Sequence, residues 1–293
     1  MIRRMTVTLI ASVFLIGVLS PPVLAKKKKG NKNVPVYYLS LGTSLAAGVQ
    51  ADPLTGQSIV TDVSYPSELA DILKQDIKKL RHKNFGCPGE TATSFIDGGL
   101  CDYPQGSQLD QAVQFLHAHG KFTGLITIDL GANDILQCVD GSNIDLICFG
   151  RLLEELPDEL SYILEALRES APGIPIVGMN YYNPLLVFWF EDPYIAELTV
   201  ELQKLFNNVL ESVYAAYGVP VADVAGGYMS YDLTTDDNVN SIPDSIELLC
   251  AWTWMCNFQN IHANDAGYAA IADEFVSVLP EIPISTPPRK RLR

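Results

Sequence analysis

The sequence predicts an α/β fold in which helices cover both faces of a parallel β-sheet. Short apolar runs alternate along the chain with longer segments whose apolar residues recur at helical spacing. The apolar runs contain few polar residues, and strands that lack a solvent-facing side are typical of parallel sheets. Because such sheets bind ligands beyond the carboxyl ends of their strands, the residues that follow each strand are the candidates for a site.

The first half of the chain supplies three predicted strands and two predicted helices. Residues 34–41 and 122–130 are apolar runs rich in strand-forming residues, and residues 84–86 allow only a brief strand. Residues 65–80 place four aliphatic side chains on one helical face, which predicts the first helix. Residues 108–119 predict the second helix.

The second half of the chain continues this alternation. Residues 151–170 predict a helix that ends before the turn residues Pro172 and Gly173, and residues 174–179 predict the next strand. Residues 196–217 form a long amphipathic pattern that stops at Gly218, since glycine is favoured just after a helix. A strand over 219–224 and a helix over 265–278 complete the expected layers.

The N-terminus has the pattern of a secretory signal peptide. Arg3 and Arg4 precede an apolar run over 8–19, and Ala25 follows at the usual cleavage spacing. The run is shorter than the roughly 20 apolar residues that a membrane-spanning helix needs. We therefore expect a secreted, extracellular protein with a signal peptide over 1–25, a basic flexible leader over 26–33, one globular domain over 34–282 and a basic tail over 283–293.

The charge of the chain argues against nucleic acid as a partner. The formal net charge is −14 at pH 7, and phosphate would be repelled by so acidic a protein. The basic runs at the two ends are expected to be solvated tails, with binding to an anionic envelope as the alternative. We expect a monomer.

Six cysteines in an exported chain predict disulfide bonds. Several connectivities are possible. The spacing favours three local pairs, which are Cys87 with Cys101, Cys138 with Cys148, and Cys250 with Cys256. A zinc site is the alternative, but no two cysteines have the Cys-x2-Cys spacing and the histidines are scattered, so we expect no metal.

Four residues carry the groups that a catalytic site needs. Ser44 comes directly after the first strand, Gly89 after the second, Asn133 after the third, and His262 in the loop before the last helix. Together they supply a nucleophile, backbone and amide donors for an oxyanion, and a base, which are the parts that acyl transfer requires. The positive end of a helix dipole would reinforce the free N–H of Ser44.

Taken one at a time, these residues have ordinary explanations. A serine or asparagine in such a position commonly caps a helix, and a glycine commonly forms a turn. Their combination at the edge of the sheet where ligands bind favours the functional interpretation. The α/β-hydrolase fold is another solution for a serine hydrolase, but its Gly-x-Ser-x-Gly pentapeptide does not occur in this sequence.

These segments resemble the sequence blocks of the SGNH hydrolases, also called the GDSL esterase/lipase family, which carry Ser, Gly, Asn and His in this order. The resemblance extends over about residues 34–280 and rests on Gly42-Thr43-Ser44-Leu45, on Gly89, on Gly131-Ala132-Asn133-Asp134, and on His262 with Asn264 and Gly267. The six cysteines are similar to those of secreted actinobacterial lipases of the family, in which neighbouring cysteines pair.

The resemblance implies both a fold and an activity. The fold would be flavodoxin-like, with three α/β/α layers, and the domain over 34–282 would hydrolyse carboxylic esters without a metal or any other cofactor. Ser44 would be the nucleophile and His262 its base. The backbone N–H groups of Ser44 and Gly89 and the amide of Asn133 would form the oxyanion hole.

Two residues depart from the family pattern. Thr43 stands where the family has aspartate, and we expect altered support of that loop with the chemistry retained. Gln259 stands three residues before His262, where the acid of the triad belongs, and it has no charge to stabilise the imidazolium. We predict that a backbone or side-chain oxygen of Gln259 accepts a hydrogen bond from the imidazole, with Asp265 as the alternative.

The expected substrate is a small-molecule or lipid ester. Residues 185–190 form an apolar run after the fourth strand, which would line an acyl pocket, make transient contact with a lipid surface, or lie buried under a helix. Trp252 and Trp254 lie between the last two cysteines, where they would either wall the site or fill a separate core.

Two other functions stay open at this point. A carbohydrate esterase that removes acetyl groups would need a shallow polar site, which the apolar run disfavours. A non-catalytic envelope protein that keeps the fold as a binding module is favoured by Thr43 and Gln259, and it predicts an inert Ser44.

A calcium loop is a further possibility. Residues 236–247 place acidic and amide side chains at EF-hand spacing, but Ser241 replaces the required glycine and Pro243 disrupts the loop. A polar loop is therefore the preferred interpretation of this segment.

Overall fold

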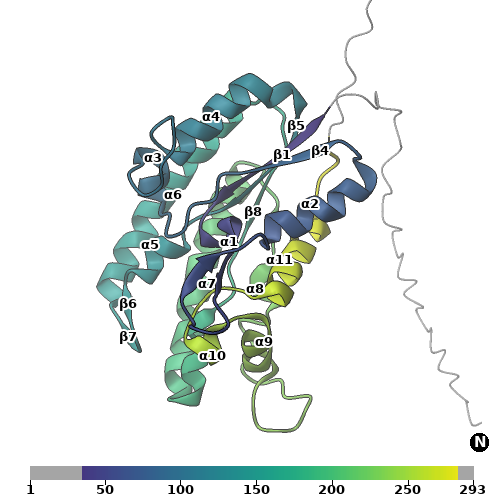
Figure 1. The fold of residues 1–293 in the computed structure, drawn as a ribbon. Helices are drawn as coiled ribbons and strands as arrows, with labels where there is room; N and C mark the ends of the chain where they lie inside the picture. The colour runs from purple at the N-terminus through teal and green to yellow at the C-terminus, as the bar shows by residue number, and fades with distance from the viewer. Residues whose placement is uncertain (1–34, 283–293) are drawn as a thin grey trace, which may run out of the picture.

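A five-stranded parallel sheet forms the centre of the molecule (Figure 1). The structure, a computed structural model, describes residues 35–282. The strands lie in the order β4 (Leu80–Asn84), β1 (Val36–Gly42), β5 (Thr123–Asp129), β8 (Ile176–Met179) and β9 (Val221–Ala222), all parallel. Numbered along the chain, this is the flavodoxin-like order 2-1-3-4-5. It confirms the predicted fold class and places the topological switch point between β1 and β5.

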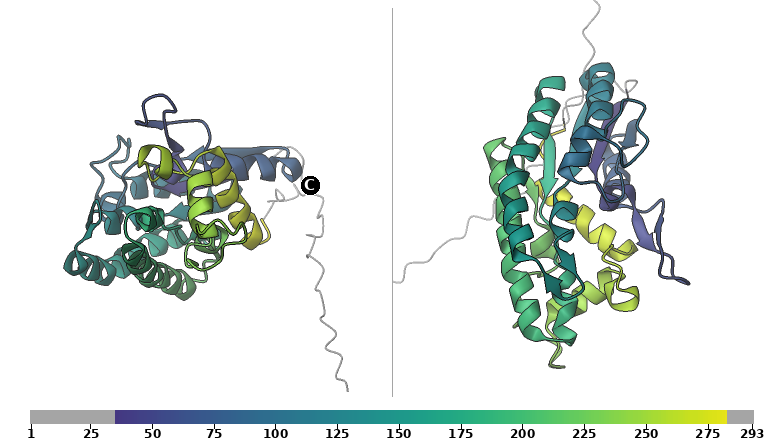
Figure 2. Two further views of the ribbon diagram at one scale, coloured as in Figure 1. Left: turned by 90° about the horizontal axis from the view of Figure 1, so that it is seen from below. Right: turned by 90° about the vertical axis from the view of Figure 1, so that its left-hand side faces the viewer.

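Two layers of helices cover the sheet (Figures 1 and 2). On one face, α2 (Tyr65–Asp76) packs against α11 (Asp265–Val278). On the other face, α6 (Leu146–Ser170) lies between α4 (Gln108–His119) and α7 (Pro193–Ala216). Every residue of β5 and β8 is buried, which explains why these strands have no polar face.

Local signals set the helix boundaries. α4 and α11 have the predicted bounds, and their N-caps, Ser107 and Asn264, each accept a hydrogen bond from the N–H of the third helical residue. α7 begins earlier than predicted because Asp192 caps it and Pro193 takes the first helical position, where a proline costs no hydrogen bond. α6 likewise begins earlier, at Leu146.

The predicted position of the second strand, at 84–86, is wrong. The strand lies at Leu80–Asn84, in a basic segment with a neighbour on one side only. An edge strand tolerates exposed Lys and Arg side chains, and these obscured the alternation of apolar and polar residues that predicts a strand. Leu80 and His82 are its inward residues. The His82 ring stacks on Tyr38 with centroids 4.7 Å apart, and Nε2 lies 2.8 Å from Ser40 Oγ. Burial lowers the pKa of His82 to about 4.

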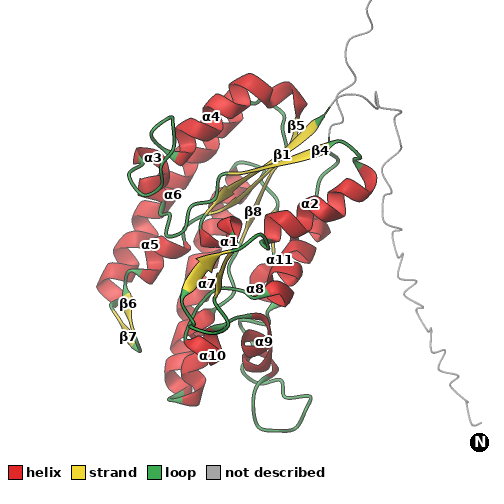
Figure 3. Ribbon diagram, in the orientation of Figure 1, coloured by secondary structure: helices red, strands yellow, loops and turns green. Residues whose placement is uncertain are grey.

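Short elements complete the molecule (Figure 3). They are too brief to establish a period, and they depend on caps and tertiary contacts. They are α1 (Ser44–Ala47), β2 (Val49–Ala51), β3 (Ser58–Val60), α3 (Ala92–Asp97), η1 (Gly120–Phe122), α5 (Ala132–Leu136), β6 (Val139–Asp140), β7 (Asn143–Ile144), η2 (Pro184–Phe190), α8 (Val224–Gly227), α9 (Asp244–Trp252) and α10 (Met255–Phe258).

The three predicted disulfide bonds are all present. Their Cα atoms are 6.1, 5.6 and 5.1 Å apart in Cys87–Cys101, Cys138–Cys148 and Cys250–Cys256, respectively. The first closes a loop after β4, the second joins the segment after α5 to α6, and the third joins α9 to α10. Each bond thus constrains a segment that lies close in sequence to a predicted site residue.

Three predicted segments lie outside the described residues: the signal peptide over 1–25, the basic leader over 26–33 and the basic tail over 283–293. Within residues 35–282, no helix is long and apolar enough to cross a membrane.

Candidate active site

Ser44 lies at the carboxyl end of β1, where the chain turns into α1. Thr43 caps this helix, and Ser44 is its first residue. Because α1 has only four residues, the dipole that we expected to act at the Ser44 N–H is small. The dipole contribution is therefore smaller than expected, and the position of Ser44 depends on its neighbours.

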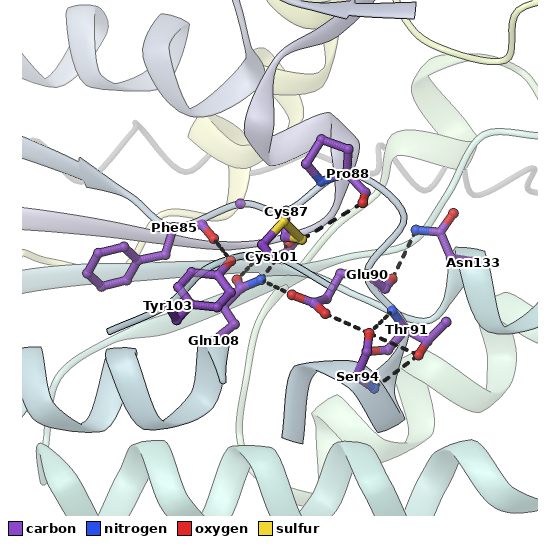
Figure 4. The surroundings of a disulfide bond; sticks show 12 residues. Phe85, Cys87, Pro88, Glu90, Thr91, Ser94, Cys101, Tyr103, Gln108 and Asn133 are labelled. Atoms are coloured by element: carbon purple, nitrogen blue, oxygen red, sulfur yellow. Dashed lines mark hydrogen bonds between the residues drawn. A yellow bond between two sulfur atoms is a disulfide. The ribbon is translucent and has the colours of Figure 1, made fainter. Parts of the chain in front are cut away.

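A buried glutamine holds the backbone just before Ser44. Gln108 Oε1 accepts a hydrogen bond from Gly42 N at 2.6 Å, and Gln108 Nε2 donates to Gly42 O at 3.0 Å. The same Nε2 donates to Glu90 Oε2 at 2.8 Å. Figure 4 shows Gln108 and Glu90 beside the Cys87–Cys101 bond. One buried network therefore joins the end of β1 to the segment that follows β4.

Asn133 enters this network from α5. Its Nδ2 donates to the backbone oxygen of Glu90 at 2.9 Å (Figure 4). The next residue, Asp134, accepts a hydrogen bond from Ala92 N at 3.0 Å, so two adjacent side chains attach α5 to the segment after β4. An amide nitrogen carries two hydrogens, and the second remains for a ligand.

Gly89 lies in the turn before Glu90 with a φ of +83°, a conformation that favours glycine. It is exposed, and it is not among the residues that line the pocket described below. The carbonyl that holds Asn133 belongs to the next residue, so Gly89 lies close to the site in sequence. The Gly89 N–H as an oxyanion donor stays a prediction.

His262 lies in the loop before α11, and Asn260 orients it. Asn260 Oδ1 lies 2.7 Å from His262 Nδ1 and accepts a hydrogen bond from His262 N at 3.1 Å. Asn260 Nδ2 donates to Ser58 Oγ at 2.9 Å, which sets the orientation of the amide. An oxygen on Nδ1 requires a proton there, so Nε2 of the neutral ring is free to accept one. This is the tautomer that a general base needs.

The charge state of His262 also suits a base. Burial lowers the pKa of His262 to about 4, so the ring is neutral at pH 7. The backbone oxygen of His262 accepts a hydrogen bond from Trp254 N at 3.0 Å, which fixes the loop against the segment between the last two cysteines.

The prediction that Gln259 is the partner of the imidazole is wrong. Gln259 is exposed and ends α10 in a left-handed conformation, whereas the oxygen on Nδ1 belongs to Asn260. The alternative, Asp265, accepts a hydrogen bond from Gln50 Nε2 at 2.7 Å. Asparagine side chains commonly bond the backbone two residues further on, so the Asn-x-His spacing is a signal that would have identified Asn260.

Ser44, Asn133 and His262 line one pocket. Because Ser44 and Asn133 follow β1 and β5, the pocket opens at the switch point of the sheet, where this fold binds ligands. The rest of the lining is mainly apolar and includes Ile135, Leu136, Phe149, Leu185, Leu202 and Phe206.

The apolar run after β8 divides between three environments. Pro184 and Leu185 line the pocket, while Leu186 and Phe188 are buried. Phe190 is 53% exposed at the end of η2. The run therefore contributes to the pocket wall, the core and the surface.

Neither Trp252 nor Trp254 lines this pocket. Trp252 packs edge to face against Tyr228 with centroids 5.0 Å apart. Trp254 Nε1 donates a hydrogen bond to Gln50 Oε1 at 3.2 Å. Of the two expected roles, the structure favours support of the core.

Hydrogen bonds within the loop over 236–247 occupy its carboxylates. Asp236 accepts from the backbone of Asn240 and Ser241, and Glu247 accepts from the side chains of Asn238 and Asn240. In the part of the chain that the structure describes, no group of three or more His, Cys, Asp or Glu side chains is placed to hold a metal ion. These contacts support a polar loop.

The chain matches the GDSL-like lipase/acylhydrolase family over residues 40–270. A search of curated proteins found no match. Among solved structures, an extracellular lipase from Streptomyces rimosus is 18% identical, with a TM-score of 0.55, and the similarity covers 83% of this chain and 100% of that one. The lipase Lip_vut3 from a goat rumen metagenome is 17% identical, with a TM-score of 0.53 and coverage of 83% and 96%.

A mutant of Axe2, an acetyl-xylooligosaccharide esterase from Geobacillus stearothermophilus, is also similar, at 15% identity with a TM-score of 0.53 and coverage of 83% and 94%. At these identities the solved structures support the fold alone. The family match spans most of the chain and includes Ser44, Gly89, Asn133 and His262. The chain therefore belongs to the GDSL-like lipase/acylhydrolase family and is a hydrolase of carboxylic esters.

Proposed function

We propose that this protein is a secreted serine esterase or lipase that forms an acyl-enzyme on Ser44. The observation that carries the proposal is the common pocket of Ser44, Asn133 and His262, in which His262 has the tautomer of a base. Three disulfide bonds support secretion, because such bonds persist in oxidising compartments.

The first half of the reaction transfers the acyl group to the enzyme. His262 Nε2 takes the hydroxyl proton of Ser44, and Oγ attacks the ester carbonyl carbon to form a tetrahedral intermediate. The N–H of Ser44, the N–H of Gly89 and the Nδ2 of Asn133 bind the negative oxygen. The intermediate then expels the alcohol, which takes the proton from His262.

The second half returns the enzyme to its starting state. Water loses a proton to His262 and attacks the acyl carbon, and the same donors bind the second oxyanion. Collapse of this intermediate releases the carboxylic acid and returns the proton to Ser44. Asn260 keeps the imidazole oriented throughout, although it has no charge to stabilise the imidazolium.

The lining of the pocket favours an ester with an apolar acyl chain. The side chains beyond Asn133 come from α5, α6 and α7 and are mostly aliphatic or aromatic, so they would desolvate a hydrocarbon chain rather than bind a sugar. Phe190, at the end of η2, and Tyr194, in the first turn of α7, are both exposed, and they support transient contact with a lipid surface.

A carbohydrate deacetylase is the second candidate. The specific observation in its favour is the fold shared with an acetyl-xylooligosaccharide esterase. An acetyl group is too short to contact the apolar side chains of α6 and α7 together with those of α5, so this candidate leaves most of the apolar wall without a function.

The test is hydrolysis of a series of p-nitrophenyl esters, from acetate to palmitate, by the parent protein and by Ser44→Ala. We expect Ser44→Ala to lose on the order of 10³-fold or more in kcat. We also expect kcat/KM of the parent to rise with acyl length beyond acetate. An active Ser44→Ala protein would refute the serine mechanism. Activity confined to acetate esters and acetylated oligosaccharides would support the deacetylase. A parent protein that is folded but hydrolyses none of the esters would support the non-catalytic binding module.

A further inference from the structure

A buried carboxylate lies directly beside the nucleophile segment, and the proposed reaction does not use it. Asp129 is the last residue of β5, and the sheet register pairs it with Gly42 at the end of β1. Its side chain is completely buried. A charged group in such a place is costly unless the fold supplies partners, so its contacts indicate what it does.

Most of these contacts go to the residue before Ser44. Asp129 Oδ2 accepts hydrogen bonds from Thr43 N at 3.1 Å and from Thr43 Oγ1 at 2.7 Å. The other oxygen, Oδ1, accepts from the Tyr65 hydroxyl at 2.9 Å. The carboxylate therefore connects the turn that carries the nucleophile to α2.

The backbone of the turn is shaped around the same group. Gly42 has a φ of +134°, and a Cβ at this position would lie 2.2 Å from Asp129 Oδ1. The same Cβ would lie 2.3 Å from the Asp129 backbone oxygen, so any side chain at position 42 would disturb both the carboxylate and the end of β5. Burial raises the pKa of Asp129 to about 7. The turn thus combines a backbone conformation that favours glycine with a buried carboxyl group. Such costly features are typical of functional sites, where they fix the geometry at the expense of stability.

The position of this carboxylate explains a departure from the family motif. The GDSL motif has aspartate where this chain has Thr43. Here the carboxylate comes from the neighbouring strand, and the threonine donates to it through both its backbone and its side chain. We propose that Asp129 is the positioning residue of the Ser44 turn and supplies, from β5, the carboxylate that the motif places at position 43.

The inference rests on the proposed role of Ser44, and two matched variants test it. Thr43→Val removes the hydrogen bond to Oδ2 together with the long cap contact from Leu45 N at 3.5 Å, and Tyr65→Phe removes the bond to Oδ1. Each variant deletes one buried hydroxyl bonded to the same carboxylate, but only the first changes the nucleophile turn. We expect Thr43→Val to lower kcat about tenfold, as the loss of one hydrogen bond to a charged group would. We expect Tyr65→Phe to stay within about threefold of the parent kcat.

Two substitutions at position 129 separate positioning from packing. Asp129→Leu keeps the branching of the side chain, in a larger volume, and removes the acceptor. We expect a loss on the order of 10²-fold in kcat with little change in KM, because the pocket walls are intact. Asp129→Asn keeps an acceptor for Thr43 and turns its amide toward the Tyr65 hydroxyl, so it should retain kcat within about threefold. A merely structural role would not produce this split between kcat and KM.

The sharpest test moves the carboxylate back to position 43. The double variant Thr43→Asp with Asp129→Ser should recover at least about tenfold in kcat over Asp129→Ser alone, since residues in contact show coupling of this size. Failure of this rescue, together with equal losses for Thr43→Val and Tyr65→Phe, would overturn the inference. Ser44→Ala, measured alongside, distinguishes this failure from failure of the serine mechanism, because only the latter leaves Ser44→Ala active.

Discussion

Asn260 Oδ1 accepts hydrogen bonds from both the backbone N–H and the ring Nδ1 of His262. The two contacts fix the position of the ring and its tautomer with a neutral side chain. In a triad, the third group also stabilises the positive imidazolium, and an asparagine lacks the charge for this. In the proposed mechanism, Ser44 and His262 therefore act as a dyad whose orienting group is an amide.

The orienting role of Asn260 predicts a loss of kcat for one substitution and a shift in the pKa of His262 for another. Asn260→Ala removes the partner of Nδ1, and we expect kcat to fall on the order of 10²-fold because the ring loses its orientation. Asn260→Asp supplies a negative charge beside Nδ1, which should raise the pKa of His262. Steady-state kinetics on a p-nitrophenyl ester measure both. Gln259→Ala is the matched control and should behave as the parent, since Gln259 is exposed; a collapse of the control would restore Gln259 to the site.

The pH profile of the parent follows from the burial of His262. The base must be neutral, and its pKa in the folded protein is lowered to about 4. The acid limb of kcat/KM should therefore lie near pH 4, rather than near the ordinary histidine value of about 6.5. A rate profile over the acidic range measures this, with circular dichroism to verify folding. In Asn260→Asp, the limb should move to higher pH. A parent limb at the ordinary value would contradict the account of a desolvated imidazole.

Asn133 should act on the transition state and not on substrate binding. Its Nδ2 has one hydrogen on the Glu90 carbonyl and one for the oxyanion. Loss of one such donor costs roughly 2.7–4 kcal/mol of transition-state stabilisation, so Asn133→Ala should lower kcat by 10²–10³-fold with KM little changed. Pre-steady-state acylation with a p-nitrophenyl ester resolves this step. An increase in KM alone would assign Asn133 to substrate binding.

The neighbouring Asp134 should make stability depend on pH. Burial raises the pKa of Asp134 to about 7, above its ordinary value of 3.8, so the folded state binds the proton more tightly than the unfolded state. Its contribution to stability is complete below about pH 4 and is lost as the pH rises through 7. His82 and His262, with lowered pKa values, act in the opposite direction between pH 4 and 6.5.

A single substitution isolates the contribution of Asp134. Asp134→Asn can still accept the Ala92 N–H but has no proton to lose. From pH 4 to 7, the free energy of unfolding of this variant should therefore increase relative to the parent. Urea unfolding at several pH values measures the difference. A difference independent of pH would show that Asp134 titrates normally.

The sequence determined the features that depend on local pattern. The sequence pattern predicted the bounds of α4 and α11, which begin directly after their N-caps. The continuous apolar runs indicated a parallel sheet. Close spacing sufficed for the cysteine pairs, because short loops leave few alternatives. Ser44 and Asn133 could be predicted as site residues from the sequence because each follows a strand, and the ends of parallel strands converge on one edge of the sheet.

Only the tertiary structure decided which polar groups meet. Asn260, and not Gln259, contacts the imidazole. Gln259 itself has a left-handed conformation at the end of α10, and its side chain is exposed to solvent. Asp129 looked like the end of an apolar strand, and its bonds to Thr43 exist because register aligns β5 with β1. The direction of a side chain in a turn, and the partner of a buried carboxyl, depend on residues distant in sequence. Periodicity and spacing contain no information about a contact between residues as distant in sequence as Asp129 and Thr43.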